Sequence, residues 1–267
     1  MKSLVLNARQ DAGFEARLQV ALDICRATNG HLSGVFAPPI ESAVALGDAL
    51  ATVELLRVVE GQEQRARDAV KARLAAENVP WDYIASTQAI APALAGLGAL
   101  ADLIVLSHPG HGAPAPFESG IIGDVVMSAR TPVLVVPDEV RGFNPAAPVV
   151  VGWNGSVEAA RALKAVAPLL HLATGVHLVA IDEGRERPLP ATMAAAYLAR
   201  HGVAAEIHAR AAPKAGVAAA LVGTARELGA SCLVMGAFGH SRLREFWFGG
   251  VTRSMIDGVA MPTIFVH

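Results

Sequence analysis

The chain contains 267 residues, which corresponds to two domains at roughly 150 residues each. Hydrophobic residues make up 53% and charged residues 17%, a composition that excludes a disordered chain. The formal net charge of −2 and the 5% of aromatic residues argue against nucleic-acid binding. No stretch of about 18 apolar residues is present, so no membrane-spanning helix is expected. The apolar segment at the start of the chain is too short for a signal peptide. We therefore expect a cytoplasmic protein with reduced, buried thiols at Cys25 and Cys232.

The sequence contains a tandem repeat. Residues 3–7 correspond to residues 148–152, and Asn29-Gly30 corresponds to Thr174-Gly175, both at an offset of 145. Each copy also ends with a proline followed by a run of apolar and β-branched residues. Because a repeat of this kind marks two copies of one folding unit, the sequence predicts two domains in tandem.

The boundaries of the two predicted domains follow from the segment between the copies. Residues 137–148 are polar and contain prolines, as expected for a linker, so we place the domains at 1–140 and 147–267. The first copy carries an additional stretch at about 41–78 that is rich in Ala and Glu. We interpret this insert as a helical, structural element that contacts the other repeat or a second subunit.

Strand-like and helix-like patterns alternate within each copy. In the second copy Ser156 is placed to cap a helix that runs to Leu170, and Gly175 is placed to end it before the next strand. Gly229 is expected to end a later helix at 217–228. The expected strands are 149–151, 176–181, 205–209, 232–235 and 263–266, and the further helices are 193–201 and 251–259. This alternation predicts an α/β fold of two doubly wound domains, each with a five-stranded parallel sheet flanked by helices, for which we assume the strand order 3-2-1-4-5.

The most informative segment is the glycine-rich stretch from Gly236 to Thr252. Its glycines let backbone N–H groups approach an anion, and the helix that starts near Gly250 offers its positive end. Hydroxyl groups of Ser241 and Thr252 and the charges of Arg242, Arg244 and Arg253 add donors for phosphate. In the order 3-2-1-4-5 this loop lies beside the loop 153–156, so both border one crevice at the carboxyl ends of the strands.

The spacing Gly236, two residues, Gly239, nine residues, Gly249 resembles the signature of the universal stress protein family in its tandem form. The resemblance covers nearly the whole chain and implies the fold given above, frequent dimers and, in one branch, ATP or another adenine nucleotide in the crevice. It assigns the phosphates and ribose to the glycines with Val251 and Thr252, the nucleoside to Trp153 and Asn154, and adenine to Ala180. The candidate nucleotide-binding residues are Trp153, Asn154, Ala180, Met235, Gly236, Gly239, His240, Ser241, Arg242, Gly249, Gly250, Val251 and Thr252.

Two positions depart from the ATP-binding pattern. Asn154 stands where those members have Asp and lacks the charge suited to Mg²⁺, and Gly250 stands where they have Ser or Thr, a loss of about 1 kcal/mol. The first copy departs further, because Ser107 replaces the first glycine, Pro109 removes a donor and Glu118 adds an anion. The first copy is therefore expected to be a degenerate partner of the second.

Other motifs give weaker signals. Residues 96–101 have the spacing of a dinucleotide fingerprint but precede a strand instead of following one. His108 and His111 are spaced for metal binding but have no further ligand nearby, so we interpret them as a polar loop pair and predict no metal site. No nucleophile and general base are spaced as a catalytic pair, so no enzyme is predicted; slow ATP hydrolysis would depend on Asp182, Glu183 or Glu245.

The sequence thus leaves two functions open. The first is a nucleotide-binding regulatory protein of the universal stress type, with ATP or a related adenine nucleotide and Mg²⁺ as ligands in the second half. The alternative is a scaffold or interaction module of the same fold whose nucleotide site has decayed. In both, the halves are expected to pack on each other or on a second subunit, with no nucleic-acid or membrane partner.

Overall fold

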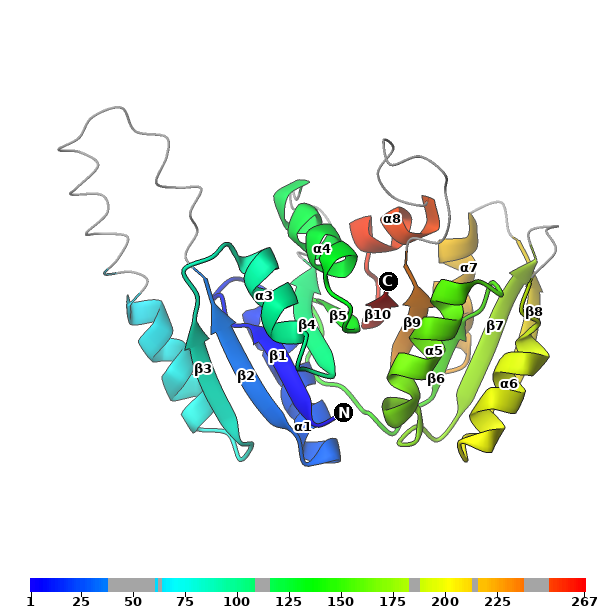
Figure 1. The fold of residues 1–267 in the computed structure, drawn as a ribbon, viewed down its shortest axis with the longest axis horizontal. Helices are drawn as coiled ribbons and strands as arrows, with labels where there is room; N and C mark the ends of the chain where they lie inside the picture. Colours follow the sequence, from blue (N-terminus) through cyan, green and yellow to red (C-terminus); the bar gives the residue numbers. More distant parts are fainter. Residues whose placement is uncertain (38–60, 62–63, 109–115, 183–187, 213–215, 238–249) are drawn as a thin grey trace.

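The computed structural model describes residues 1–37, 61, 64–108, 116–182, 188–212, 216–237 and 250–267 (Figure 1). These residues form a sheet of ten strands with helices on both faces, in the strand order β3-β2-β1-β4-β5-β10-β9-β6-β7-β8. Each half has the order 3-2-1-4-5 with parallel neighbours, so the predicted fold class is confirmed. None of the described helices is both long enough and apolar enough to cross a membrane.

The elements of the two halves follow each other in the same sequence. The first half contains β1 (Ser3–Asn7), α1 (Phe14–Thr28), β2 (His31–Phe36), β3 (Trp81–Ala85), α3 (Ile90–Gly98), β4 (Leu103–His108), α4 (Pro116–Ser128) and β5 (Val133–Pro137). The second half contains β6 (Val149–Gly152), α5 (Val157–Leu170), β7 (Val176–Asp182), α6 (Ala191–Arg200), β8 (Glu206–Ala211), α7 (Gly216–Glu227), β9 (Cys232–Gly236), α8 (Gly250–Asp257) and β10 (Thr263–Val266).

The two halves join through the last strand of each. β5 and β10 pair antiparallel, with Val133 opposite Phe265 and Val135 opposite Thr263, and all four residues are buried. Antiparallel pairing of equivalent strands is what an approximate two-fold axis between the copies produces. Above this junction α4 contacts α8 (Figure 1). The halves therefore pack on each other and form one continuous sheet.

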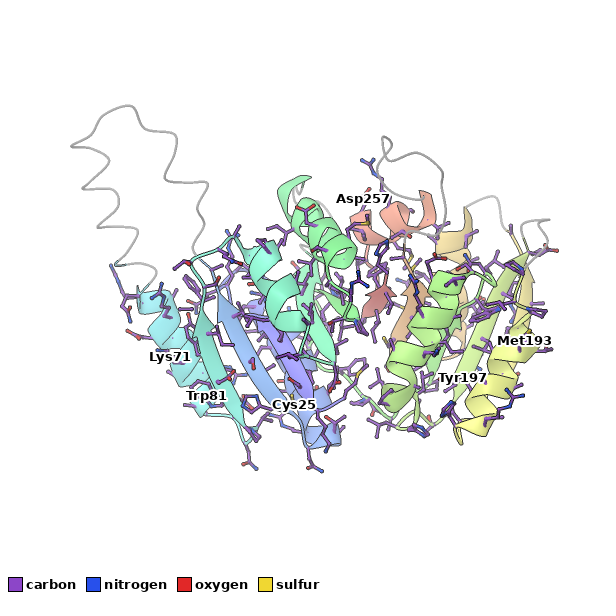
Figure 2. All side chains as sticks on the ribbon, viewed as in Figure 1. Cys25, Lys71, Trp81, Met193, Tyr197 and Asp257 are labelled. Carbon is purple, nitrogen blue, oxygen red and sulfur yellow. The ribbon has the colours of Figure 1, made fainter. Side chains whose placement is uncertain are left out.

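Apolar side chains alternate between the two faces of the sheet, because successive residues of a strand point to opposite sides. Leu4 and Leu6 of β1 belong to the core under α1, α5 and α6, whereas Val5 belongs to the core under α3, α4, α7 and α8. Cys25 of α1 (Figure 2) and Cys232 of β9 are both buried, and burial raises the pKa of each thiol to about 12.

The predicted ends of α5 are half confirmed. Ser156 caps the helix, since its Oγ accepts a hydrogen bond from the Ala159 N–H at 3.1 Å. Gly175, however, does not end the helix, which stops at Leu170 through two short turns that need no glycine (Leu172 N–H to Leu169 O and Ala173 N–H to Leu170 O). At the other site Gly229 has φ +63° just after α7, as expected of a glycine that ends a helix.

The repeat offset also needs a correction. Leu4 pairs with Leu32 and Val149 with Val176, so β1 and β6 are related by 145 positions but β2 and β7 by 144. The proposed match of Asn29-Gly30 with Thr174-Gly175 is therefore wrong by one residue. The reason is the connection between helix and strand. Two residues separate α1 from β2, the first of them Asn29 in a left-handed conformation with φ 49°, whereas five residues separate α5 from β7.

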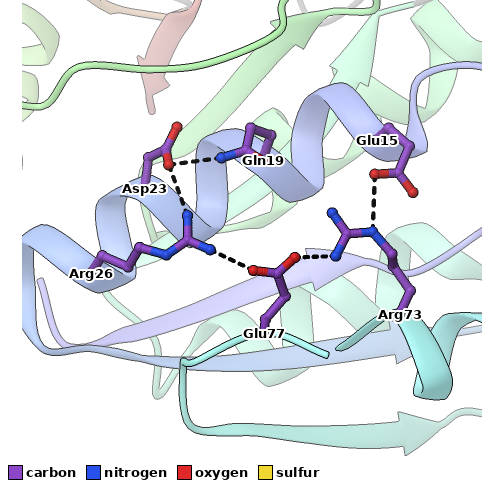
Figure 3. Close-up of polar contacts among 6 residues, drawn as sticks. All are labelled: Glu15, Gln19, Asp23, Arg26, Arg73 and Glu77. Atoms are coloured by element: carbon purple, nitrogen blue, oxygen red, sulfur yellow. Dashed lines mark hydrogen bonds and ion pairs between the residues drawn. The ribbon is translucent and has the colours of Figure 1, made fainter. Parts of the chain in front are cut away.

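The described part of the insert is helical at residues 64–75, while the rest of residues 41–63, apart from Gly61, lies outside the described residues. Val70 and Leu74 of this helix are fully buried in the core of the first half. Its charged face is tied to α1 (Figure 3): Arg73 Nε lies 3.2 Å from Glu15 Oε2, and Arg26 Nη2 lies 2.5 Å from Glu77 Oε2. The described part of the insert therefore packs as a structural layer on the first half.

Candidate functional site

The two strands that lead into the loops expected to form the crevice are neighbours in the sheet. β6 pairs with β9, with Val151 opposite Val234, so the loop at 153–156 and the segment after Gly236 leave adjacent strands at the same edge. Gly239, His240, Ser241, Arg242 and Gly249 lie outside the described residues, as do Arg244, Glu245 and the aromatic residues at 246–248. The described candidates are Trp153, Asn154, Ala180, Met235, Gly236, Gly250, Val251 and Thr252.

Gly236 has a packing reason to be glycine. A Cβ at this position would lie 2.5 Å from the carbonyl carbon of Glu158 and 2.6 Å from the N atom of Ala159, both in the backbone of α5. Gly250 differs, since none of the described atoms lies within 4 Å of a Cβ there. Gly236 therefore lets the start of α5 approach β9, whereas Gly250 opens α8 on an exposed surface.

Asn154 shapes the loop between β6 and α5. Its Oδ1 accepts a hydrogen bond from the Ser156 N–H at 3.1 Å, and Gly155 between them has φ +74°. This turn delivers the chain to the cap at Ser156. The side chain of Asn154 is exposed, and its Nδ2 donates to none of the described residues, so the amide group faces outward with donors available.

Trp153 lies in the core instead of lining the loop surface. The residue is 4% exposed, and its indole N–H donates to the carbonyl of Leu189 at 2.9 Å. The Leu189 N–H in turn donates to the Gly155 carbonyl at 3.2 Å, so the segment before α6 is anchored over the loop. The side chain of Trp153 thus stabilises the loop at 153–156 from the core side. The family resemblance implies instead that Trp153 contacts a nucleoside.

The remaining described candidates surround the same end of the sheet. Ala180 is half-buried near the carboxyl end of β7, and Met235 is 6% exposed near the end of β9. Val251 is half-buried and Thr252 is buried, both in the first turn of α8. Among all eight described candidates, only Asn154 and Gly250 are exposed, and both lie at the ends of loops.

The equivalent place in the first half is occupied by Arg17, whose side chain is fully buried. Its Nε donates to the Asn7 carbonyl at 2.6 Å, and its Nη1 lies 2.5 Å from Asp11 Oδ1 and 2.7 Å from Ser107 Oγ. Nη2 donates to the carbonyl of Arg9. Burial lowers the pKa of Arg17, and the adjacent carboxylate of Asp11 opposes that shift. Arg17 therefore ties the ends of β1 and β4 together from inside.

A second large side chain closes the end of β2. Phe36 is 5% exposed, its ring lies 6.5 Å from that of Tyr83, and the guanidinium of Arg67 lies 4.9 Å above it. By strand register Phe36 corresponds to Ala180, because β2 and β7 are offset by 144. The position assigned to adenine in the second half is thus filled by an aromatic ring in the first.

The same contrast holds at two further positions. Leu4 of β1 pairs with Leu103 of β4, and the equivalent Val149 of β6 pairs with Cys232 of β9, so Ser107 at the end of β4 corresponds to Gly236 at the end of β9. The 145-residue offset between β1 and β6, continued into the helices that follow, makes Arg17 correspond to Ala162. The same offset holds at the start of the helices, because Gly13 lies against Ser107 and Glu158, 145 positions later, lies against Gly236. At all three places the first half has a large or polar side chain and the second half has Ala or Gly.

A cavity of about 60 Å³ remains at this end of the first half. That volume holds a few water molecules and is far below the several hundred Å³ of a usual ligand pocket. The cavity is lined by Asn7, Arg9, Asp11, Ala12, Gly13, Ile90, Leu106, Ser107, Ile121 and Ile122. His108, expected in a loop, is the last residue of β4 and is buried, while His111 lies outside the described residues.

Two features were missed from sequence. Glu158 in the first turn of α5 is 8% exposed, and its Oε2 has no hydrogen-bond partner among the described residues. His177, Glu206 and His208 bring three potential metal ligands within 4.8 Å of one another. The pattern Glu-x-His at 206–208 places two of them on one face of a strand, but only the pairing of β7 with β8 adds the third.

Comparison with solved structures relates this geometry to known proteins. A universal stress protein from Archaeoglobus fulgidus DSM 4304 superposes with a TM-score of 0.73 at 14% identity, covering 99% of this chain and 96% of that one. A functionally unknown protein from Pseudomonas aeruginosa PAO1 gives 0.58 at 16% identity, with 100% and 92% covered. A protein from P. aeruginosa UCBPP-PA14 assigned to the universal stress proteins gives 0.54 at 17%, with 99% and 91% covered.

The chain therefore has the tandem fold of universal stress protein structures, over its full length. No protein-family profile and no curated protein sequence matches it.

Proposed function

We propose that the protein is a regulatory protein of the universal stress type that binds one adenine nucleotide, ATP or a close relative, in its C-terminal half. The observation that carries the proposal is the contrast between the halves. Arg17, Phe36 and Ser107 occupy the ends of the strands in the first half, and the corresponding residues are Ala162, Ala180 and Gly236. Of the three, half-buried Ala180 is the position that leaves room for a ligand where the first half has the ring of Phe36, whereas Ala162 is packed in the core and the space beside Gly236 is taken by the backbone of α5.

The chemistry of the proposed site follows from the residues around it. Adenine would lie against Ala180, and the exposed amide of Asn154 would donate to ribose or phosphate. The phosphates would lie at the N-terminal end of α8, where the N–H groups after Gly250 and the helix dipole favour an anion. Binding at the start of α8 would shift the packing of α8 on α4, and a ligand transmits a signal in this way when its affinities for two states differ.

Among the described residues, Glu158 offers a buried carboxylate to a magnesium ion at this site. Asn154 carries no charge, but the buried Oε2 of Glu158 has no partner among the residues described, and a hard cation prefers such an oxygen ligand. A buried, unpaired carboxylate near a triphosphate is unfavourable unless a cation neutralises both. We therefore assign the ion, where it accompanies the nucleotide, to Glu158 rather than to Asn154, and we infer a binding role without catalysis.

The alternative function, a ligand-free interaction module in a stress response, is favoured by two other observations. Gly236 is required by the approach of α5, so its presence does not depend on phosphate. Asn154 likewise has a structural task in the turn before α5. Under this alternative the small residues at the carboxyl ends of β7 and β9 would serve packing alone.

The deciding experiment is calorimetric titration of the full chain with ATP, ADP and AMP, with and without Mg²⁺. The Ala180→Phe variant copies Phe36 of the first half into the site, and we expect it to weaken binding at least about tenfold. Ile207→Phe, at an exposed position of the neighbouring strand β8, is the matched control and should bind normally. Absence of binding by the unmodified chain at millimolar nucleotide, or equal binding by Ala180→Phe, would favour the interaction module.

A further inference from the structure

Three side chains converge at the edge of the second half, away from the proposed nucleotide site. His177 lies near the amino end of β7, where it stands opposite Glu206 of β8, and Val179 stands opposite His208. Alternate residues of paired strands share a face, so His177, Glu206 and His208 all project from the same side of the sheet. The nucleotide crevice lies at the opposite, carboxyl ends of these parallel strands.

The three groups lie close enough together to share a ligand, and the two imidazoles are also within hydrogen-bond distance of each other. His177 Nδ1 lies 3.0 Å from His208 Nε2, whereas Glu206 oxygens lie 3.6 Å from His177 Nδ1 and 3.7 Å from His208 Nε2. The carboxylate is thus too far for a good hydrogen bond to either ring. Tetrahedral zinc ligands at about 2.0–2.1 Å from the ion are themselves about 3.3–3.4 Å apart, so binding an ion needs movements of only a few tenths of an ångström.

The surroundings leave one side of this cluster open to solvent. The side chains of His177 and His208 are 13% and 10% exposed, and that of Glu206 is 68% exposed. Neutral imidazole is the form that binds metals, and the exposed carboxylate leaves room for water as a further ligand.

We propose that His177, Glu206 and His208 bind a divalent transition-metal ion of the Zn²⁺ type. Two imidazoles and one carboxylate are ligands that Zn²⁺ accepts, with water in the fourth position. The ion would join β7 to β8, the edge strand, five of whose six residues are exposed. Its effect is to fasten an edge that has few apolar contacts of its own, and the inference does not depend on nucleotide binding.

The test uses tag-free, full-length protein that has been stripped with a chelator and transferred to nucleotide-free buffer. Calorimetric titration with Zn²⁺ and metal analysis after dialysis should give one ion per chain. His208→Gln should weaken binding at least about tenfold and remove the rise in melting temperature that Zn²⁺ produces. His171→Gln, which removes an exposed histidine of the same half, is the control and should bind like the unmodified chain.

Substitution of Co²⁺ adds a readout of geometry, since d–d absorbance reports nitrogen and oxygen ligands around the ion. Should His208→Gln fail to fold by circular dichroism, Glu206→Gln at the exposed position replaces it and must weaken binding as well. Equal Zn²⁺ affinity in the variants and the unmodified chain, or no stoichiometric binding, would overturn the proposal. The three groups would then be a histidine pair joined by a hydrogen bond only.

Discussion

Ser107 occupies the space beside Gly13 that any side chain at position 13 would need. A Cβ on Gly13 would lie 2.3 Å from the Oγ and 2.6 Å from the Cβ of Ser107. In the second half the roles are exchanged, because Glu158 replaces the glycine on the helix and Gly236 replaces the serine on the strand. The start of the helix and the end of the strand therefore approach so closely that one of the two residues has to be glycine.

The first prediction concerns this exchange. Gly13→Ala should lower the free energy of unfolding by about 1–3 kcal/mol, because the new methyl group overlaps Ser107. Adding Ser107→Gly should recover part of that loss, giving a favourable coupling of about 0.5 kcal/mol or more in a double-mutant cycle measured by urea unfolding. Strictly additive effects would show that the two residues do not compete for space.

The second prediction concerns Gly236, whose neighbours are backbone atoms of α5 and cannot move singly. Gly236→Ala should therefore destabilise the protein at least as much as Gly13→Ala, by about 1–3 kcal/mol or more. Gly223→Ala in α7, where no described atom lies within 4 Å of the new Cβ, is the control and should be neutral or stabilising by up to about 1 kcal/mol. Equal effects of Gly236→Ala and Gly223→Ala on the urea midpoint would contradict the close packing of α5 against Gly236.

The third prediction concerns Arg17. Replacing this fully buried residue by Met removes the partner of Asp11 and the donors to two carbonyl groups, and should cost about 3–5 kcal/mol. Arg26→Met, which breaks ion pairs of a half-exposed arginine on the same helix, is the control and should cost no more than about 1 kcal/mol. Comparable losses in thermal unfolding of the two variants would show that Arg17 does not fasten β1 to β4.

The fold was predictable from local signals repeated along the chain. Buried β-branched runs, helical periodicity and the tandem repeat were sufficient to predict the alternation of strands and helices in two copies, and the order 3-2-1-4-5 that we assumed for a doubly wound sheet is the one found in both halves. The cap at Ser156 and the helix end at Gly229 were predictable because both depend on one residue and its immediate neighbours. Gly175 was misassigned because the turns after Leu170 satisfy the helix carbonyls with backbone hydrogen bonds, which do not require a particular residue type and so leave no pattern in the sequence.

The site was less predictable, because its side chains are placed by contacts between distant segments. Trp153 follows a strand at the expected edge, but which way its indole turns depends on Leu189. The burial of Arg17 depends on Ser107, which is ninety positions away. The cluster of His177 with Glu206 and His208 likewise exists only through the register of β7 with β8.

The fourth prediction follows from the thiols. Burial raises the pKa of Cys25 and Cys232 to about 12, so neither is appreciably ionised at pH 8, and the thiolate is the reactive form. Folded protein should therefore react with Ellman's reagent at a negligible rate, and both thiols should react on addition of denaturant. Rapid modification of either cysteine in the folded protein would contradict their burial.

The fifth prediction concerns acid. Because burial lowers the pKa of His177, the unfolded chain binds a proton at a pH where the folded chain does not. In chelator, the free energy of unfolding should thus decrease as pH falls below about 6.5, the ordinary histidine value, until the lowered pKa is reached. His177→Gln should flatten this dependence, and Glu206→Gln should steepen it, since the carboxylate raises the pKa. A dependence unchanged in both variants would contradict the assignment to His177.

The central claim is that the two halves are unequal and that only the C-terminal one accepts a nucleotide. Native mass spectrometry of the full chain equilibrated with ATP measures this most directly. We predict one adenine nucleotide per chain, absent from Ala180→Phe and retained in Phe36→Ala. Two nucleotides per chain, or one that survives Ala180→Phe, would contradict it.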